Sequence, residues 1–219
     1  MGSITRGLSN NITTSGVILP AGITNSSVSA VTSFANASGG TLTLLSTQTA
    51  SASATISFTT GLDSTYDEYI FKFIDIHPAT DDTRFQFNGS TDSGSNYNVT
   101  KTTTSFRAYH YENDSGAGLD YQTGEDLAQS TSFQGLTHEI GNDADQNSSG
   151  TLTIFNPSST TYVKHFISTG ICNAYDNRPN NAYIAGYMNT TSAINAVRFQ
   201  MSSGNIDDGI FKLYGVKKS

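Results

Sequence analysis

Apolar and polar residues alternate over most of the chain beyond residue 40. The segments 41–44, 54–59 and 84–88 alternate residue by residue. A period of two places the apolar side chains on one face of an extended strand. Further segments with strand patterns are 69–78, 104–111, 150–156, 162–171, 182–188, 194–201 and 210–216. The pattern predicts about ten short strands, separated by turns rich in Gly, Asn, Asp and Ser.

The segment 69–76 differs from the others because apolar residues occupy both alternating sets of positions. Its sequence reads Tyr-Ile-Phe-Lys-Phe-Ile-Asp-Ile. Such continuous apolar runs are typical of strands that are buried on both faces. Pro78, two residues further on, removes a backbone donor and ends the strand. We therefore predict a strand that other elements cover on two sides.

The number and spacing of the strands predict the fold class. Chains with many short strands and frequent turns form antiparallel sandwiches or jelly rolls, whereas α/β folds need helices between the strands. The segment 124–136 is the one stretch that suits a helix or a long loop, with Glu125 and Asp126 at its start. We predict an all-β antiparallel β-sandwich, or jelly roll, over residues 41–219, preceded by an extended arm over residues 1–40.

The predicted arm differs in composition from the rest of the chain. Arg6 is the only charged residue before Asp63, and Phe34 and Phe58 are the only aromatic residues in that stretch. So few apolar side chains cannot offset the entropy of ordering the segment by itself. Uncharged segments rich in Thr and Val do favour extended structure once a neighbour provides pairing partners. We expect the arm to take its order from a partner surface.

Charge is scarce throughout the chain, which narrows the range of partners. Charged residues make up 13% of the sequence and the net charge is −7, while Ser and Thr together number 59. An acidic chain whose basic residues are scattered singly is a poor ligand for nucleic acid. No apolar run approaches the ~18 residues of a membrane helix, and the first residues lack the apolar core of a secretory signal. We expect neither nucleic acid nor membrane as a partner.

Residues that carry enzyme chemistry are present, but they do not form recognisable catalytic motifs. The histidines His77, His110, His138 and His165 never have metal-binding spacing on a helix, and Cys172 is the only cysteine. The position of Cys172 at the end of an apolar strand predicts a buried, unreactive thiol. A glycosidase needs two carboxylates across a sugar. The sequence singles out no pair among Glu68, Glu112, Glu125, Glu139, Asp120 and Asp176. We predict no enzyme activity and no cofactor.

One segment is similar to a calcium-binding loop. Asp143, Asp145 and Asn147 place oxygen donors at every second residue, as Ca²⁺-binding loops do. The EF-hand pattern fails, because Ser148 stands where it requires Gly and Ile154 stands where it requires Glu. Asp and Asn also dominate ordinary turns, in which they bond to nearby backbone. Asp143, Asp145 and Asn147 are therefore the metal candidates, and an ordinary turn is the favoured alternative.

Two phrases and one strand resemble known proteins. The phrases are Phe-Gln-Phe-Asn-Gly-Ser-Thr-Asp-Ser-Gly-Ser-Asn-Tyr at 85–97 and Gly-Asn-Ile-Asp-Asp-Gly-Ile-Phe-Lys-Leu-Tyr-Gly-Val at 204–216, and the strand is 69–78. Together they resemble the β-sandwich virion proteins of tailed bacteriophages, especially those of marine cyanophages and their relatives. The resemblance covers about residues 60–219, and the arm is similar to the attachment segments of such proteins. It implies a part of the virion, in the head or in the tail, and implies no catalytic residues.

The leading hypothesis is a non-enzymatic structural protein of a phage virion: a decoration, fibre or knob-like component that docks through its arm on capsid or tail subunits. Jelly rolls commonly close into trimers that cover their strand edges, so we expect a homotrimer. The alternative is a receptor- or carbohydrate-binding module of a tail appendage, which would recognise host-surface glycan. Its motivation is the set of polar and aromatic loop residues that includes Tyr109, Tyr111, Tyr121, Tyr175 and Asp176. A polysaccharide depolymerase is a third hypothesis, for which the sequence identifies no acid.

Overall fold

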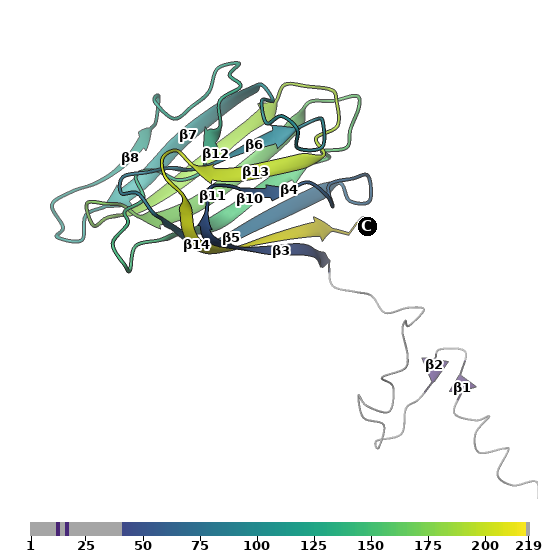
Figure 1. Cartoon of the computed structure of the whole chain (residues 1–219), viewed down its shortest axis with the longest axis horizontal. Coiled ribbons are helices and arrows are strands. Elements are labelled where there is room, and N and C mark those ends of the chain that lie inside the picture. Colours follow the sequence, from purple (N-terminus) through teal and green to yellow (C-terminus); the bar gives the residue numbers. More distant parts are fainter. Residues whose placement is uncertain (1–11, 14–15, 18–40, 218–219) are drawn as a thin grey trace, which may run out of the picture. The chain divides into compact units, whose positions relative to one another are not determined.

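The computed structural model describes residues 12–13, 16–17 and 41–217 (Figure 1). The chain divides into two units, residues 1–39 and residues 40–219. In the first unit, strands β1 (Ile12–Thr13) and β2 (Gly16–Val17) form an antiparallel pair. The other residues of the predicted arm lie outside the described residues, so the arm stays a prediction.

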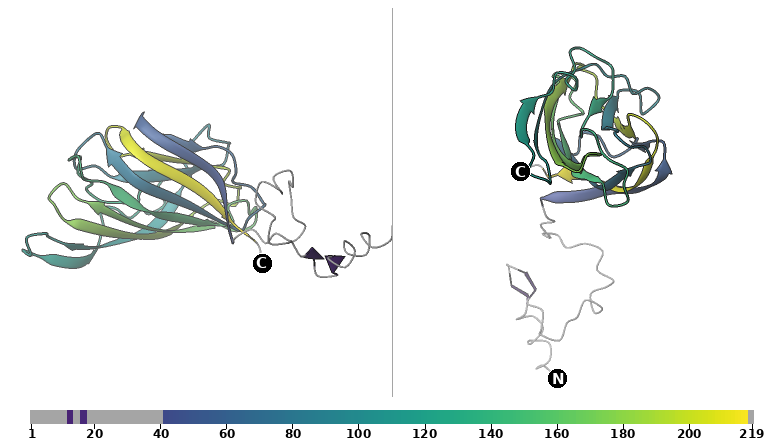
Figure 2. Two further views of the ribbon diagram at one scale, coloured as in Figure 1. Left: turned by 90° about the horizontal axis from the view of Figure 1, so that it is seen from below. Right: turned by 90° about the vertical axis from the view of Figure 1, so that its left-hand side faces the viewer.

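Residues 41–217 form two antiparallel sheets and contain no helix, as Figures 1 and 2 show. One sheet has eight strands in the order β3 (Leu42–Ser53), β14 (Ile206–Val216), β5 (Glu68–Pro78), β10 (Ser148–Phe155), β11 (Lys164–Asn173), β12 (Pro179–Met188), β7 (Lys101–His110) and β8 (Ala117–Tyr121). The other has four strands in the order β4 (Ile56–Phe58), β13 (Ala196–Met201), β6 (Phe85–Ser90) and β9 (Gln134–Gly135). The predicted all-β sandwich is confirmed. No helix long and apolar enough to cross a membrane occurs among the described residues.

The core lies between the two sheets and is rich in aromatic rings. The ring of Phe199 lies 5.3–6.3 Å, centroid to centroid, from the rings of Phe58, Phe71, Phe85 and Phe211. All five side chains are buried, and aromatic pairs of this kind add about 0.5–1.5 kcal/mol beyond the burial of their area. Since these residues come from β4, β6 and β13 on one side and from β5 and β14 on the other, the cluster holds the two sheets together.

Every strand that the alternation predicts overlaps an observed strand. The sequence analysis does not predict β8, β9 or the extension of β3 to Ser53. Apolar residues do not alternate in β9 or in the extension of β3, and β8 alternates over only five residues, Ala-Gly-Leu-Asp-Tyr. The segment 124–136, for which we expected a helix or a long loop, is a loop that carries the short strand β9. A regular apolar stripe is therefore a sufficient sign of a strand in this chain, but not a necessary one.

Strand β5 differs from its prediction in one respect. Tyr69, Phe71 and Phe73 are buried in the core, but Ile70 and Ile74 on the opposite face are only half-buried. The four-stranded sheet covers the inner face of the eight-stranded sheet, and no element among residues 41–217 covers the outer face. The prediction of a strand covered on two sides is therefore wrong within the described chain, and the apolar outer residues have no cover there.

Candidate interaction surface

The outer face of the eight-stranded sheet carries apolar and hydroxyl side chains where the solvated face of an antiparallel sheet is usually polar. On β10, β11, β12 and β7, outward positions alternate with buried ones such as Leu152, Phe166 and Ile184. We name the outward residues of these four strands the neutral face, because none of them is Asp, Glu, Lys or Arg. They are Ser149, Thr151, Thr153, Phe155, His165, Ile167, Thr169, Ile171, Asn173, Pro179, Asn181, Tyr183, Ala185, Tyr187, Thr102, Thr104, Phe106, Ala108 and His110.

Strand pairing arranges the neutral face in continuous rows. Ile167 lies opposite Thr153 on one side and opposite Ala185 on the other. Ala185 in turn lies opposite Thr104. Residues opposite one another on one face have Cβ atoms about 4.5–5.5 Å apart. The four strands therefore present one contiguous surface rather than scattered apolar side chains.

Two aromatic side chains of the neutral face stack on each other while exposed. The rings of Phe106 on β7 and Tyr183 on β12 have centroids 4.9 Å apart and planes inclined by 10°. These side chains are 41% and 37% exposed, and Ile167 on the neighbouring strand β11 is 53% exposed. Single exposed apolar residues are ordinary, but contiguous patches of them mark interaction sites.

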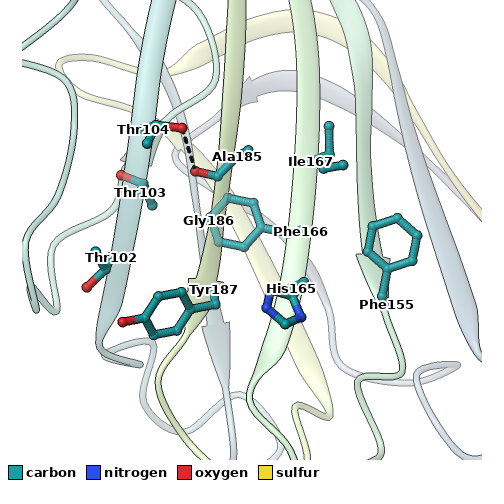
Figure 3. A pocket seen from close by; sticks show the side chains of 10 residues that line it. All are labelled: Thr102, Thr103, Thr104, Phe155, His165, Phe166, Ile167, Ala185, Gly186 and Tyr187. Atoms are coloured by element: carbon teal, nitrogen blue, oxygen red, sulfur yellow. Dashed lines mark hydrogen bonds between the residues drawn. The ribbon is translucent and has the colours of Figure 1, made fainter.

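A hollow of about 490 Å³ lies beside this pair on the neutral face (Figure 3). Phe155, His165 and Tyr187 line one side of it, on three neighbouring strands. The hydroxyl of Thr104 donates a hydrogen bond to the carbonyl of Ala185 at 3.4 Å, so this polar group already has a partner. Sites for small polar ligands need several convergent polar groups. The hollow therefore suits an apolar group better than a sugar.

A charged network lies where the loops after β7 and β11 meet. The carboxylate of Glu139 accepts hydrogen bonds from Arg107 at 2.7 Å and from Arg178. Arg178 also donates to the Tyr111 hydroxyl at 2.5 Å and pairs with the Asp176 carboxylate at 3.0 Å. Burial raises the pKa of Glu139, but the two guanidinium groups outweigh this effect and hold the pKa below its ordinary value. The charges balance one another, which is typical of a network that ties loops together.

Ser105, His138 and Glu125 are ordered like the triad of a serine hydrolase. The Ser105 hydroxyl lies 3.5 Å from Nε2 of His138, and Nδ1 of His138 lies 3.9 Å from the Glu125 carboxylate. Ser105 and His138 are buried, however, so a substrate cannot reach the hydroxyl. Burial lowers the pKa of His138 to about 4, which keeps the imidazole neutral near pH 7. These residues therefore belong to the core.

The predicted metal candidates lie near a hollow at the turn that precedes β10. This hollow of about 300 Å³ is lined by Asp75, His77, Ala144, Asp145, Gln146, Asn147, Asp207 and Asp208. Asp143 is not among them, and its backbone carbonyl accepts a hydrogen bond from the Gln146 amide at 2.8 Å, as in an ordinary turn. Within the described part of the chain, no three His, Cys, Asp or Glu side chains are grouped to hold a metal ion.

The other chemically active residues are separate from one another. Nδ1 of His77 lies 2.7 Å from the Gln146 carbonyl, and Nε2 of His110 lies 3.1 Å from the Asp114 carboxylate. Cys172 is buried, and burial raises the pKa of its thiol to about 12, which agrees with the prediction of an unreactive thiol. None of these groups forms a shared site with another.

The tyrosines that motivated the glycan hypothesis are only partly brought together. The rings of Tyr109 and Tyr111 lie 5.9 Å apart, and the Arg178 guanidinium lies over both. Beside them is a hollow of about 200 Å³ lined by Tyr111, Glu112, Asn113, Asp176 and Asn177. Tyr121 lies on β8 and Tyr175 in the loop after β11, and neither lines this hollow.

The burial of two lysines was not predicted from the sequence. Nζ of Lys101 donates to the Asn88 side-chain carbonyl at 2.6 Å and to the Val99 carbonyl at 2.8 Å, and burial lowers its pKa to about 7. Lys164 is also buried and donates to the Thr190 carbonyl at 3.0 Å. The sequence did contain one sign of their burial. Each lysine is the first residue of its strand and stands at a position that alternates with the outward positions.

Among these features, the neutral face is the one whose exposed apolar side chains, such as Phe106 and Ile167, are not covered within the described chain, although hydroxyls at its edges, such as those of Ser149 and Thr102, have hydrogen-bond partners. The Arg178 network, the buried histidine and the buried lysines all find partners inside the sandwich. Comparisons of the chain with protein-family models, with curated proteins and with solved structures gave no match.

Proposed function

We propose that this chain is a non-enzymatic structural protein of a bacteriophage virion, which docks on capsid or tail subunits through its N-terminal arm. The observation that carries the proposal is that an almost uncharged arm precedes a sandwich whose outer face has an uncharged surface over four strands, the neutral face. Surfaces without charges lose little solvation when a protein neighbour covers them. The resemblance of 69–78, 85–97 and 204–216 to phage virion proteins supports the same assignment.

The division of the chain suggests how such a subunit works. The sandwich is a rigid body, held by its aromatic core. The arm supplies backbone groups that a neighbouring sheet edge pairs by strand addition. Each arm adds little affinity alone, but several arms on a homo-oligomer bind a symmetric particle at high effective concentration.

Removing residues 1–40 tests this proposal. A tagged full-length chain, supplied while particles assemble, is expected in purified virions, and the truncated chain is expected to fold but to be absent from them. Immunoblots of the particles measure incorporation, and circular dichroism of the purified chain checks its folding. Normal incorporation of the truncated chain contradicts docking through the arm. Absence of the full-length chain from particles contradicts the virion role.

The hollow lined by Tyr111 and Asp176 favours a second function, recognition of host-surface glycan. An aromatic ring beside carboxylate and amide groups offers the stacking and the bidentate hydrogen bonds that sugars need. Binding of the full chain to a glycan array, lost in Asp176→Ala and kept in Asp145→Ala at the other acidic hollow, is the expected result. An array without any bound glycan removes this second function.

A further inference from the structure

We propose that a second copy of this chain packs against the neutral face, so that two sandwiches meet through the outer faces of their eight-stranded sheets. The inference rests on the proposed function in one respect, that a structural subunit associates with its own copies. It concerns the sandwich and not the arm. It names both the surface and its occupant.

The distribution of charge favours a copy of this chain as the occupant. The chain has a net charge of −7, so two copies repel each other overall, and a contact without charged side chains adds least to this repulsion. The neutral face offers such a contact. The charged residues that are exposed or half-buried on the adjoining strands β5 and β14 lie outside the neutral face; they are Glu68, Lys72, Asp75, Asp207, Asp208 and Lys212. Covering it therefore buries no unpaired charge.

The shape of the neutral face supports a symmetric contact. A two-fold interface uses the same patch twice, so the patch must hold both a feature that inserts and a feature that receives. The exposed stack of Phe106 and Tyr183 provides the first, and the hollow between Phe155 and Tyr187 provides the second. Tyr183 is two residues from Ala185, which lines the hollow. A two-fold axis that passes between Tyr183 and Ala185 places the Phe106–Tyr183 pair of each copy over the hollow of the other copy.

The size of the neutral face is adequate for a stable contact. Three of its strands have 10 residues and β10 has 8. At about 4.8 Å between strands and about 3.4 Å per residue, the four strands cover roughly 620 Å² on each copy. Specific interfaces bury about 600–1,000 Å² on each partner, so the neutral face lies at the lower end of this range. Two sheets packed at the usual spacing of ~10 Å bring these residues into contact.

Other occupants fit the neutral face less well. The arm acts through its backbone, and a backbone gains partners at a sheet edge, whereas the backbone groups of β10, β11, β12 and β7 are already paired on both sides. A glycan needs more polar groups than the hollow holds. The neutral face of a second copy is the partner that matches both the shape of this face and its lack of charge.

The test measures the mass of the full-length chain by sedimentation equilibrium between about 1 and 100 μM. The wild-type chain is expected to dimerise, and Ile167→Glu, which places two charges in the interface, is expected to raise the dissociation constant at least ~100-fold. Thr47→Glu is the matched control, since Thr47 is exposed on β3 and lies outside the neutral face. It is expected to leave the dimer intact.

Tyr183→Glu is the second variant, in case Ile167→Glu does not fold by circular dichroism. A wild-type chain that stays monomeric throughout, or a dimer that neither folded variant weakens, overturns the proposal. A trimer, the state expected from the sequence alone, also overturns the face-to-face arrangement. Loss of the dimer contact in folded variants supports it. The arm deletion separates this inference from the proposed function. A truncated chain that dimerises but does not enter particles leaves the inference standing. A full-length chain that enters particles as a monomer contradicts the inference but not the proposed function.

Discussion

The two faces of the eight-stranded sheet both carry large apolar side chains, but in very different surroundings. On the inner face, Phe71 and Phe166 are buried beneath the four-stranded sheet. On the outer face, Phe106 on β7 and Ile167 on β11 are exposed, with β12 between the two strands. Alternation in a sequence therefore tells which residues share a face, but coverage of that face depends on what packs against it.

The difference has an energetic meaning. Burial of apolar surface contributes roughly 25 cal/mol per Å², and the inner face gains this within one chain. The outer face gains it only when another surface covers it. Substitutions on the inner face are thus expected to change the free energy of unfolding of a single chain, and substitutions on the outer face to change association.

Phe199→Ala is expected to have the largest effect on the inner face. It removes a buried ring that contacts four other rings and leaves a cavity between the sheets. Such truncations cost about 3–5 kcal/mol, measured here as the loss of unfolding free energy in urea. Ile167→Ala on the outer face, in dilute solution, is the matched control, with an expected loss below ~1 kcal/mol. Equal losses at both positions contradict the comparison of the two faces.

His138 makes the inner side of the sandwich sensitive to acid. Its folded-state pKa of about 4 lies below the ordinary value of 6.5, so the unfolded chain binds a proton between these pH values while the folded chain does not. Stability is therefore complete above pH 6.5 and falls by about 3 kcal/mol as the pH drops to 4.

The check is the pH dependence of urea unfolding for the wild-type chain and for His138→Gln. Burial raises the pKa of the neighbouring Glu125, which changes stability in the opposite direction. Arg84, Arg107, Asp120 and Glu139 also act on His138. The difference between the two curves isolates the histidine. A difference that does not change between pH 6.5 and 4 contradicts this assignment.

Glu139→Gln is expected to cost about 2 kcal/mol in unfolding free energy. It removes the carboxylate that Arg107 and Arg178 share, while Arg178 keeps Asp176 and Arg107 keeps Asp120 as ion-pair partners. Loss of one partner of a fully buried ion pair costs about 3–5 kcal/mol, and the expected cost is lower because the Glu139 side chain is 28% exposed. Asp114→Asn, at a side chain that is 92% exposed, is the control with almost no change. Equal stability of the two variants shows that the network does not stabilise the fold.

The sequence predicts the fold better than the candidate site. Alternation locates the strands because each hides one side of itself in the core, and Val197, Phe199 and Met201 are buried in phase. It does not locate β8, whose only strong apolar residues, Leu119 and Tyr121, are exposed. Alternation also does not reveal the neutral face, because the residues of this face come from four strands that are brought together only by the order of the strands in the sheet.

The sequence also gives no sign that Glu139 joins Arg107 to Arg178. These residues are separated by tens of positions along the chain, and none of them has another of the three nearby in the sequence. Their association follows from the antiparallel arrangement of β7 and β12, which brings the end of one strand beside the start of the other. Long-range pairing of this kind carries no local pattern, whereas the alternation that identified the strands is local by nature.

The smallest expected effect is the dependence of the unfolding free energy on protein concentration, and one measurement of it reports on both faces of the eight-stranded sheet. If the neutral face binds a second copy, the free energy of unfolding rises with protein concentration, by up to about 1.4 kcal/mol per chain for a hundredfold increase. Thermal unfolding at a low and at a hundredfold higher concentration measures the rise as a shift in the melting temperature. Ile167→Glu is expected to abolish this shift, although its monomer folds with an intact core. Phe199→Ala is expected to keep the shift but to melt at a lower temperature than the wild-type chain at both concentrations. A melting temperature that does not depend on concentration in the wild-type chain means that the outer face, unlike the inner one, contributes nothing through self-association.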